Sequence, residues 1–210
     1  MKLRHIFMAL VCAASALGSL AYAQQRDKDS EAVLLVASPN LRDADYRQSV
    51  VIAVPIENDR HLGVIINRPT RRSLSSLFPD HQPSKRVSEP VYFGGPMSRG
   101  ALVAVVRSGK DPGRGAIGLT RDMYLAMTVN VVDRVIEETP NNARYYVGYI
   151  VWRPGELRAE VDRRLWNVVN VNQDVVFRKD MSGLWDELSR MARAVTASAD
   201  GFIAGGSAHP

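Results

Sequence analysis

Cysteine is nearly absent from this 210-residue chain, whose single example, Cys12, lies in an apolar N-terminal run. Only three histidines follow that run, His61, His81 and His209, and no two of them are three or four residues apart. Disulfides and cysteine nucleophiles are therefore excluded for the rest of the chain. The histidine spacing also lacks a zinc motif, so the sequence predicts no metal site and no cofactor.

The common catalytic motifs are missing as well. The chain has no P-loop, no G-x-S-x-G elbow and no S-x-x-K motif with partners. The segment "FGGPMSRG" at 93–100 is glycine-rich but lacks the strand–loop–helix order of a phosphate-binding loop, which favours tight turns. A helix-turn-helix and an aromatic RNA-reading motif are also lacking, so we expect no specific nucleic-acid partner.

The N-terminus is typical of a secretory signal peptide. Lys2 and Arg4 precede the apolar run, and Ala21-Tyr22-Ala23 is a small-x-small cleavage site ahead of Gln24. The run is shorter than the ~20 residues of a spanning helix, which disfavours the alternative of a membrane anchor. We expect cleavage after Ala23, a periplasmic or secreted protein, and no stable membrane span afterwards. Cleavage takes Lys+Arg from 27 to 25 against 22 Asp+Glu, a net charge of +3.

The rest of the chain predicts one domain over 24–195, with a polar leader at 24–31 and a flexible, Gly/Ala/Ser-rich tail at 196–210. Apolar runs predict strands at 32–39, 50–56, 61–67, 91–96, 100–108, 143–152 and 174–177. The polar segment 57–60 indicates a hairpin between the second and third of these strands.

Helical spacing is found in three segments, at 120–139, 155–166 and 182–195. In the first, Met123, Met127, Val131 and Val135 share one face, with Thr120 as the N-cap candidate. In the second, Glu160 can pair with Arg164 one turn on. A helix of one to two turns is expected in the proline-rich loop 68–90. Strands followed by mixed strands and helices favour a single α+β domain with a strongly bent mixed β-sheet flanked by helices.

Serine chemistry is the enzymatic alternative that the residues leave open. Ser49 or Ser98 could act as a nucleophile only with a histidine such as His61 beside it. Serines and aspartates near strand ends more often cap turns, and Asp43 is expected to do so. Arginine clusters at 68–72 and 153–164 fit either solvated faces or a strip that binds a polyanion.

Four segments taken in order resemble the YqgE/AlgH family of uncharacterised bacterial proteins. They are "LLVASPNLRDADYRQSVV" at 34–51, "GVIINRP" at 63–69, "YFGGPM" at 92–97 and "GYIVWRPGEL" at 148–157, the last followed by Trp166. The resemblance implies a bent, partly barrel-like sheet and no established enzyme activity. Family members have been described as transcriptional regulators without an agreed mechanism.

Together these observations favour a non-enzymatic, exported binding or regulatory module with a protein or small-molecule partner in the cell envelope. The residues expected to line its binding surface are Asp43, Ser49, Asn67, Gly94, Gly95, Pro96, Trp152 and Trp166. The alternatives are a serine-dependent hydrolase using Ser49 or Ser98 with His61, or a cytoplasmic transcriptional regulator if the signal peptide is not real.

Overall fold

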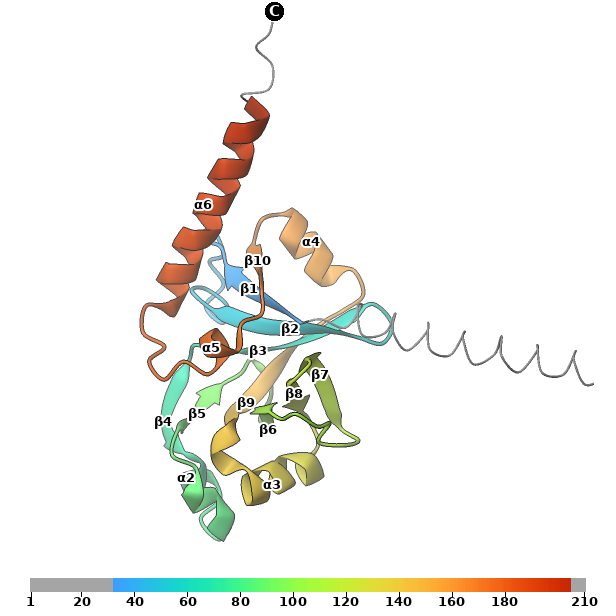
Figure 1. Ribbon diagram of the computed structural model, residues 1–210, viewed down its shortest axis with the longest axis vertical. Coiled ribbons are helices and arrows are strands. Elements are labelled where there is room, and N and C mark those ends of the chain that lie inside the picture. The colour runs from blue at the N-terminus through green and yellow to red at the C-terminus, as the bar shows by residue number, and fades with distance from the viewer. Residues whose placement is uncertain (1–31, 205–210) are drawn as a thin grey trace, which may run out of the picture.

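The computed structural model describes residues 32–204, with side chains described through residue 194 (Figure 1). The predicted signal peptide, the polar leader and the last six residues of the predicted tail lie outside this range. A ten-stranded sheet dominates the described part, and its longest path runs β10-β1-β2-β3-β9-β6-β8-β7.

One half of the sheet is antiparallel and consists of β1 (Val33–Ala37), β2 (Val50–Ile56), β3 (Arg60–Ile65) and β10 (Trp166–Asn170). The predicted hairpin is confirmed, because β2 pairs with β3 across the turn at 57–59. β10 was not predicted. It pairs with β1 so that Val33 lies opposite Asn170, which places the first and last strands side by side.

The other half is organised on the long strand β9 (Ala143–Trp152), which the apolar run at 143–152 predicted as central. β9 pairs with β3, with β6 and, in parallel, with β5, so the sheet is mixed. The remaining strands are β4 (Pro69–Ser73), β5 (Pro90–Phe93), β6 (Met97–Arg107), β7 (Ala116–Thr120) and β8 (Met123–Ala126).

The helices are short except for the last one. They are α2 (Leu74–Leu77), η1 (Gln82–Arg86), α3 (Val129–Glu138), η2 (Pro140–Asn142), α4 (Glu156–Asp162), α5 (Gln173–Val176) and α6 (Leu184–Ala204). α3 packs on β6, and α6 starts against β1 and β10 before extending away from the sheet (Figure 1). The α+β prediction with a single domain is confirmed.

The sheet bends enough to enclose its own core, but it does not close into a barrel. The amide of Ala32, next to β1, donates to the carbonyl of Leu119 in β7, at 3.1 Å, so the two halves approach each other. Side chains from both halves, such as Ile52, Val105 and Leu125, fill the interior. A second core lies under α3, and a third lies between the first half and α4.

The helix predicted over 120–139 is wrong in its first part. Residues 116–126 form the β7–β8 hairpin, and the helix begins only at Val129, with Thr128 rather than Thr120 at the N-cap position. Met123 and Met127 are four residues apart, and this spacing places them on one face of either a helix or a strand. The spacing alone was therefore ambiguous, and residues 123–126 form a strand because they pair with β6.

Three further segments differ from the prediction. The run at 174–177, predicted as a strand, falls on the one-turn helix α5 and its C-cap residue Phe177. β4 occupies part of the segment predicted as a loop around a single short helix. The last helix continues past Val195 to Ala204, so the first part of the predicted tail is helical.

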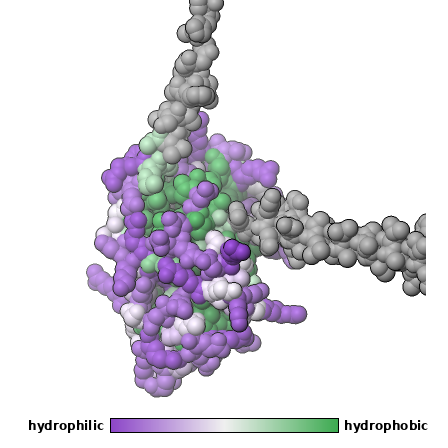
Figure 2. Space-filling view, viewed as in Figure 1, coloured by the Kyte–Doolittle hydropathy of each residue, from purple (hydrophilic) through white to green (hydrophobic). Residues whose placement is uncertain are grey.

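The surface in the view of Figure 2 is mostly hydrophilic, and hydrophobic residues gather over β1 and β10 beside α6. Val168 of β10 and Met191 of α6 are among the exposed large hydrophobic residues, at 48% and 58%. Among the described residues, no helix has the length and hydrophobicity needed to cross a membrane.

Candidate functional site

The side chain of Asn67 links the loop 38–49 to the end of the β2–β3 hairpin by hydrogen bonds. Its Oδ1 accepts a hydrogen bond from the amide of Val50 at 2.9 Å, and its Nδ2 donates to the carbonyl of Gln48 at 3.0 Å. Gln48 has a positive φ of 54°, which turns the chain into β2. The amide side chain therefore replaces backbone pairing where β3 ends, and this role is structural.

Asp43 and Ser49 also shape this loop. Asp43 Oδ1 accepts from the amide of Asp45 at 2.8 Å, the turn geometry that the sequence predicted for it. Ser49 is fully buried, and its hydroxyl donates to the carbonyl of Tyr46 at 2.6 Å. Both side chains are engaged with the backbone, and Ser49 does not reach the surface.

Gly94 and Gly95 allow β5 to lie against β9 at the point where Gly148 bends it. A Cβ on Gly94 would lie 2.3 Å from the carbonyl oxygen of Gly148, and a Cβ on Gly148 would lie 2.2 Å from that of Gly95. Gly148 also has φ +73°, a conformation that favours glycine. Pro96 follows, half-buried, and leads into β6. The glycines at 94 and 95 therefore let two backbone segments approach closely, in agreement with the interpretation of 93–100 as tight turns.

Trp152 and Trp166 form a buried pair with Glu160 of α4. Both indoles donate to the same carboxylate oxygen of Glu160, from Trp152 Nε1 at 2.9 Å and from Trp166 Nε1 at 2.8 Å. The rings meet edge to face at 6.4 Å, and Tyr46 packs on Trp166 in the same manner at 6.2 Å. The tryptophans are 3% and 4% exposed, so they belong to the core and do not line an open groove.

Glu160 therefore does not act as the sequence predicted. Helical spacing pointed to an ion pair between Glu160 and Arg164, but α4 ends at Asp162 and Arg164 has φ 58°. Leu165 donates to the carbonyl of Glu160 as the chain leaves the helix. The carboxylate turns inward to the two indoles.

At the surface of this region the half-buried Arg68 and Phe93 lie beside the exposed Arg99, and we call these three residues the Arg–Phe–Arg cluster. The Arg68 and Arg99 guanidinium carbons lie 6.0 Å and 5.6 Å from the centroid of the Phe93 ring. Arg68 donates to the carbonyls of Asp45 and Arg47 at 2.7 Å and 2.9 Å. The Arg99 side chain is 65% exposed, and its nearest acid, Asp45, is 3.8 Å away.

This cluster was only partly visible in the sequence. Arg68 lay in a recognised basic cluster, and Phe93 and Arg99 lay in the glycine-rich segment 93–100. The meeting of Arg68 with the other two depends on the pairing of β4 with β5. The amide of Phe93 donates to the carbonyl of Arg68 at 2.9 Å, and the amide of Ile65 donates to the carbonyl of Gly94 at 2.8 Å. These bonds fix the positions of Arg68 and Phe93.

The serine and histidine side chains considered for catalysis are not brought together. His61 lies opposite Pro55 in the β2–β3 register, whereas Ser49 precedes the other end of β2. Six extended residues separate those ends by about 20 Å. Ser98 lies on the β6 side of β9, where its hydroxyl donates to the Tyr149 hydroxyl at 3.1 Å, and His61 lies on the β3 side opposite Trp152.

Burial has the largest effect on the electrostatics of the region. It lowers the pKa of His61, an effect strengthened by Arg158 and opposed by Asp59. It also lowers the pKa of the Arg68 guanidinium. The pKa of Tyr46 is raised by burial and by the charges of Asp43 and Asp45. Neither Ser49 nor Ser98 gains a general base from these shifts, because His61 lies beside neither of them.

Elsewhere in the described part of the chain, one group of side chains has ligand atoms close enough together to hold a metal ion. It consists of His81, Asp133 and Glu137. This group lies at η1 and α3, on elements that do not carry the Arg–Phe–Arg cluster.

The profile of the AlgH-like family matches residues 34–195. The chain belongs to the AlgH-like family. It is 32% identical to a UPF0301 protein of Thermobifida fusca over 170 residues, which cover 75% of this chain and 84% of that one. It is 29% identical to a UPF0301 protein of Mycobacterium tuberculosis over 164 residues, which cover 75% and 79% of the two chains.

Two solved structures share the fold. A crystal structure of a Corynebacterium diphtheriae protein matches with a TM-score of 0.64, at 20% identity, over 77% of this chain and 86% of that one. The solution structure of the AlgH protein from Pseudomonas aeruginosa matches with a TM-score of 0.57, at 20% identity, over 85% and 95%. The AlgH-like resemblance seen in the sequence is thus confirmed for the family and the fold.

Proposed function

We propose that this AlgH-like chain is a non-enzymatic, exported binding or regulatory module that recognises an anionic group through the Arg–Phe–Arg cluster. The observation that carries the proposal is the placement of two guanidinium groups about the ring of Phe93. Guanidinium groups match carboxylates and phosphates in a bidentate manner, and they stack on aromatic rings. The partner is a protein or small molecule of the cell envelope that presents such a group.

The two arginines have different parts in this proposal. Arg68 donates two hydrogen bonds to carbonyls of the loop 38–49, so its role is to stabilise the conformation of this surface. Arg99 is mostly exposed and meets Asp45 only at 3.8 Å. An exposed ion pair of this kind is worth about 0–1 kcal/mol, so a stronger anion can displace Asp45 at little cost.

The residues expected from the sequence to bind the partner lie next to the Arg–Phe–Arg cluster and stabilise the backbone that carries it. Asn67, Gly94 and Gly95 fix the backbone that carries Arg68 and Phe93. Trp152 and Trp166 pack beneath the loop through Tyr46. Substituting these residues is therefore expected to act through stability first.

The binding surface is tested by recovering partners from an envelope fraction with the mature protein. Arg99→Glu and Phe93→Ala are expected to lose the partner that the wild type retains. The first variant removes the exposed guanidinium, and the second removes the ring on which the guanidinium groups lie. Arg121→Glu is the matched control, with the same charge change at an exposed turn. Equal recovery by wild type, Arg99→Glu and Phe93→Ala would exclude this surface.

Export is tested by cell fractionation and the intact mass of the protein. A periplasmic or secreted chain that starts at Gln24 is the expected result, because Ala21-Tyr22-Ala23 resembles a signal-peptidase site. A full-length cytoplasmic chain would refute export. Steeply salt-dependent DNA binding by such a chain would then favour the transcriptional regulator.

A further inference from the structure

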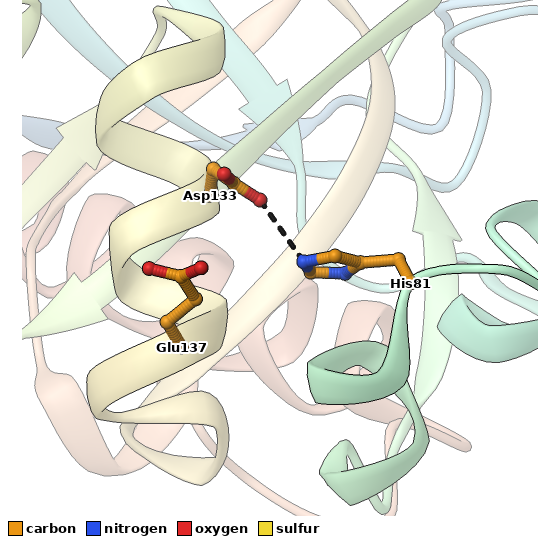
Figure 3. Close-up of side chains that lie close together, drawn as sticks. All are labelled: His81, Asp133 and Glu137. Atoms are coloured by element: carbon orange, nitrogen blue, oxygen red, sulfur yellow. Dashed lines mark ion pairs between the residues drawn. The ribbon is translucent and has the colours of Figure 1, made fainter.

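We propose that His81, Asp133 and Glu137 form a binding site for a single divalent zinc-type metal ion. Their potential ligand atoms all lie within 4.8 Å of one another, and His81 Nε2 is 3.2 Å from Asp133 Oδ1. Figure 3 shows the imidazole facing Asp133, with the carboxylate of Glu137 one helical turn further along α3. This site is separate from the proposed partner surface and does not depend on it.

The separation of the donor atoms fits the coordination distances of zinc. Zinc lies 2.0–2.2 Å from nitrogen and oxygen ligands, so two ligands at a tetrahedral angle are about 3.4 Å apart. The imidazole nitrogen and the Asp133 oxygen already have nearly this separation. Glu137 lies at i+4 from Asp133 on the same helical face, which places its carboxylate beside them.

The charge of the site also suits a divalent cation. Two carboxylates balance the +2 charge, and the imidazole shifts the preference from Mg²⁺ or Ca²⁺ toward zinc and similar ions. The nearby guanidinium of Arg86 donates to the main-chain carbonyl of Glu137 at 2.6 Å. It therefore pairs with the backbone at the end of α3 and leaves the Glu137 carboxylate available.

The backbones that carry the three ligands are held in place. The carbonyl of His81 accepts from the hydroxyl of Ser84 at 2.7 Å and from its amide at 3.1 Å, and Ser84 is 1% exposed. α3 is anchored by four buried side chains, Val131, Val132, Val135 and Ile136. Arg86 joins the two elements through its bond to Glu137. A site built on such fixed elements loses little order when it binds a metal.

The sequence missed this group because the search for zinc motifs depended on pairs of histidines. Here a single histidine from a proline-rich loop meets two acids that lie more than fifty residues further along the chain. The fold leaves side-chain exposures of 28% for His81 and 52% for Asp133, so water can complete the coordination. Three protein ligands and an open position are typical of zinc sites that keep a water.

The test is calorimetric titration of the mature protein with Zn²⁺ in a non-chelating buffer. The wild type is expected to bind one Zn²⁺ per chain at this site. Glu137→Gln and His81→Gln are expected to weaken binding by at least about tenfold, the loss that even an outer-shell change produces at metal sites. Glu138→Gln is the matched control, since it makes the same change one residue along α3.

A second readout separates loss of the ligand from loss of the fold. The imidazole resonance of His81 should shift on addition of Zn²⁺ and should stay unshifted with a similar excess of Mg²⁺. Circular dichroism of each variant should match the wild type. Unchanged Zn²⁺ affinity in Glu137→Gln and His81→Gln, or equal losses in Glu137→Gln and Glu138→Gln, would overturn the proposal.

Discussion

At the scale of single residues, Glu160 is the side chain on which the buried aromatic group depends. One carboxylate oxygen accepts from Trp152 and Trp166, and both rings are almost completely buried. Glu160→Ala would leave two buried N–H groups without an acceptor, each costing about 1–3 kcal/mol. We expect this variant to lower the free energy of unfolding by about 2–4 kcal/mol, measured by urea denaturation followed by tryptophan fluorescence.

Asp162→Ala is the control for Glu160, because Asp162 is exposed at the end of the same helix. Its effect should stay within about 0.5 kcal/mol. Glu160→Gln keeps a side-chain oxygen and should fall between the two. A Glu160→Ala variant as stable as Asp162→Ala would contradict the role given to the carboxylate.

Some of these residue roles could be predicted from the sequence. The turn at Asp43 and the backbone crossing at the glycines follow from what aspartate and glycine do locally. The partners of Glu160 could not be predicted, because the helical rule assumes that the helix continues to Arg164. That helix ends two residues earlier, and only the packing of α4 on β9 and β10 identifies the true partners.

At the scale of elements, the first turn of α6 is joined to the segment before it by Arg178 and Glu187. The two guanidinium nitrogens of Arg178 donate to the two carboxylate oxygens of Glu187 at 2.6 Å and 3.0 Å. These bonds lower the pKa of Glu187 below its usual value. The stabilisation is present above the unfolded pKa of about 4.3 and is lost as the pH falls through the lower folded value.

The expected result is that Glu187→Gln is less stable than the wild type at pH 7, and that the difference disappears at acid pH below the folded pKa. Unfolding curves at a series of pH values measure it. Asp186→Asn is the matched control, since Asp186 shares the first turn of α6 and its favourable helix dipole. If Asp186→Asn showed the same pH-dependent difference, the dipole rather than Arg178 would be responsible.

The elements themselves were predictable where an apolar run had clear boundaries. β2, β3 and β9 are runs of this kind, bounded by turn residues. The run at 174–177 was too short for periodicity to distinguish a strand from a helix. The segment 120–139 combined a strand and a helix whose apolar positions share a spacing of four, so the boundary at Thr128 was hidden.

At the scale of the whole molecule, the class of fold followed from the order of the elements, whereas their arrangement did not. The pairing of β1 with β10 joins residues about 129 to 137 positions apart, and the parallel pairing of β5 with β9 joins segments about 54 apart. Local patterns carry no information about such pairings. The Arg–Phe–Arg cluster likewise depends on the pairing of β4 with β5, and the His81 site depends on the contact of η1 with α3.

Arg144 shows how one side chain can join distant parts of the molecule. It is 1% exposed, and it donates to Glu89 at 2.7 Å, to the carbonyl of Val176 at 2.7 Å and to that of Arg178 at 2.9 Å. Burial acts to lower the pKa of its guanidinium, but the bond to Glu89 and nearby groups raise it overall. Arg144 therefore stays charged and binds β9 to the segments on either side.

Arg144→Ala should consequently weaken the whole domain and not just one element. Removing the guanidinium leaves the carbonyl of the buried Val176 without a donor and unpairs the half-buried Glu89, and unpaired buried polar groups cost about 1–3 kcal/mol each. Urea denaturation would measure this loss. Hydrogen exchange should accelerate both in β9 and at 173–178. Arg107→Ala is the control, because Arg107 contacts the same segment through the Phe177 ring at 4.3 Å but is exposed. Its cost should be about 0.5–1 kcal/mol. Equal losses in the two variants, or faster exchange confined to 173–178, would show that Arg144 does not hold the domain together.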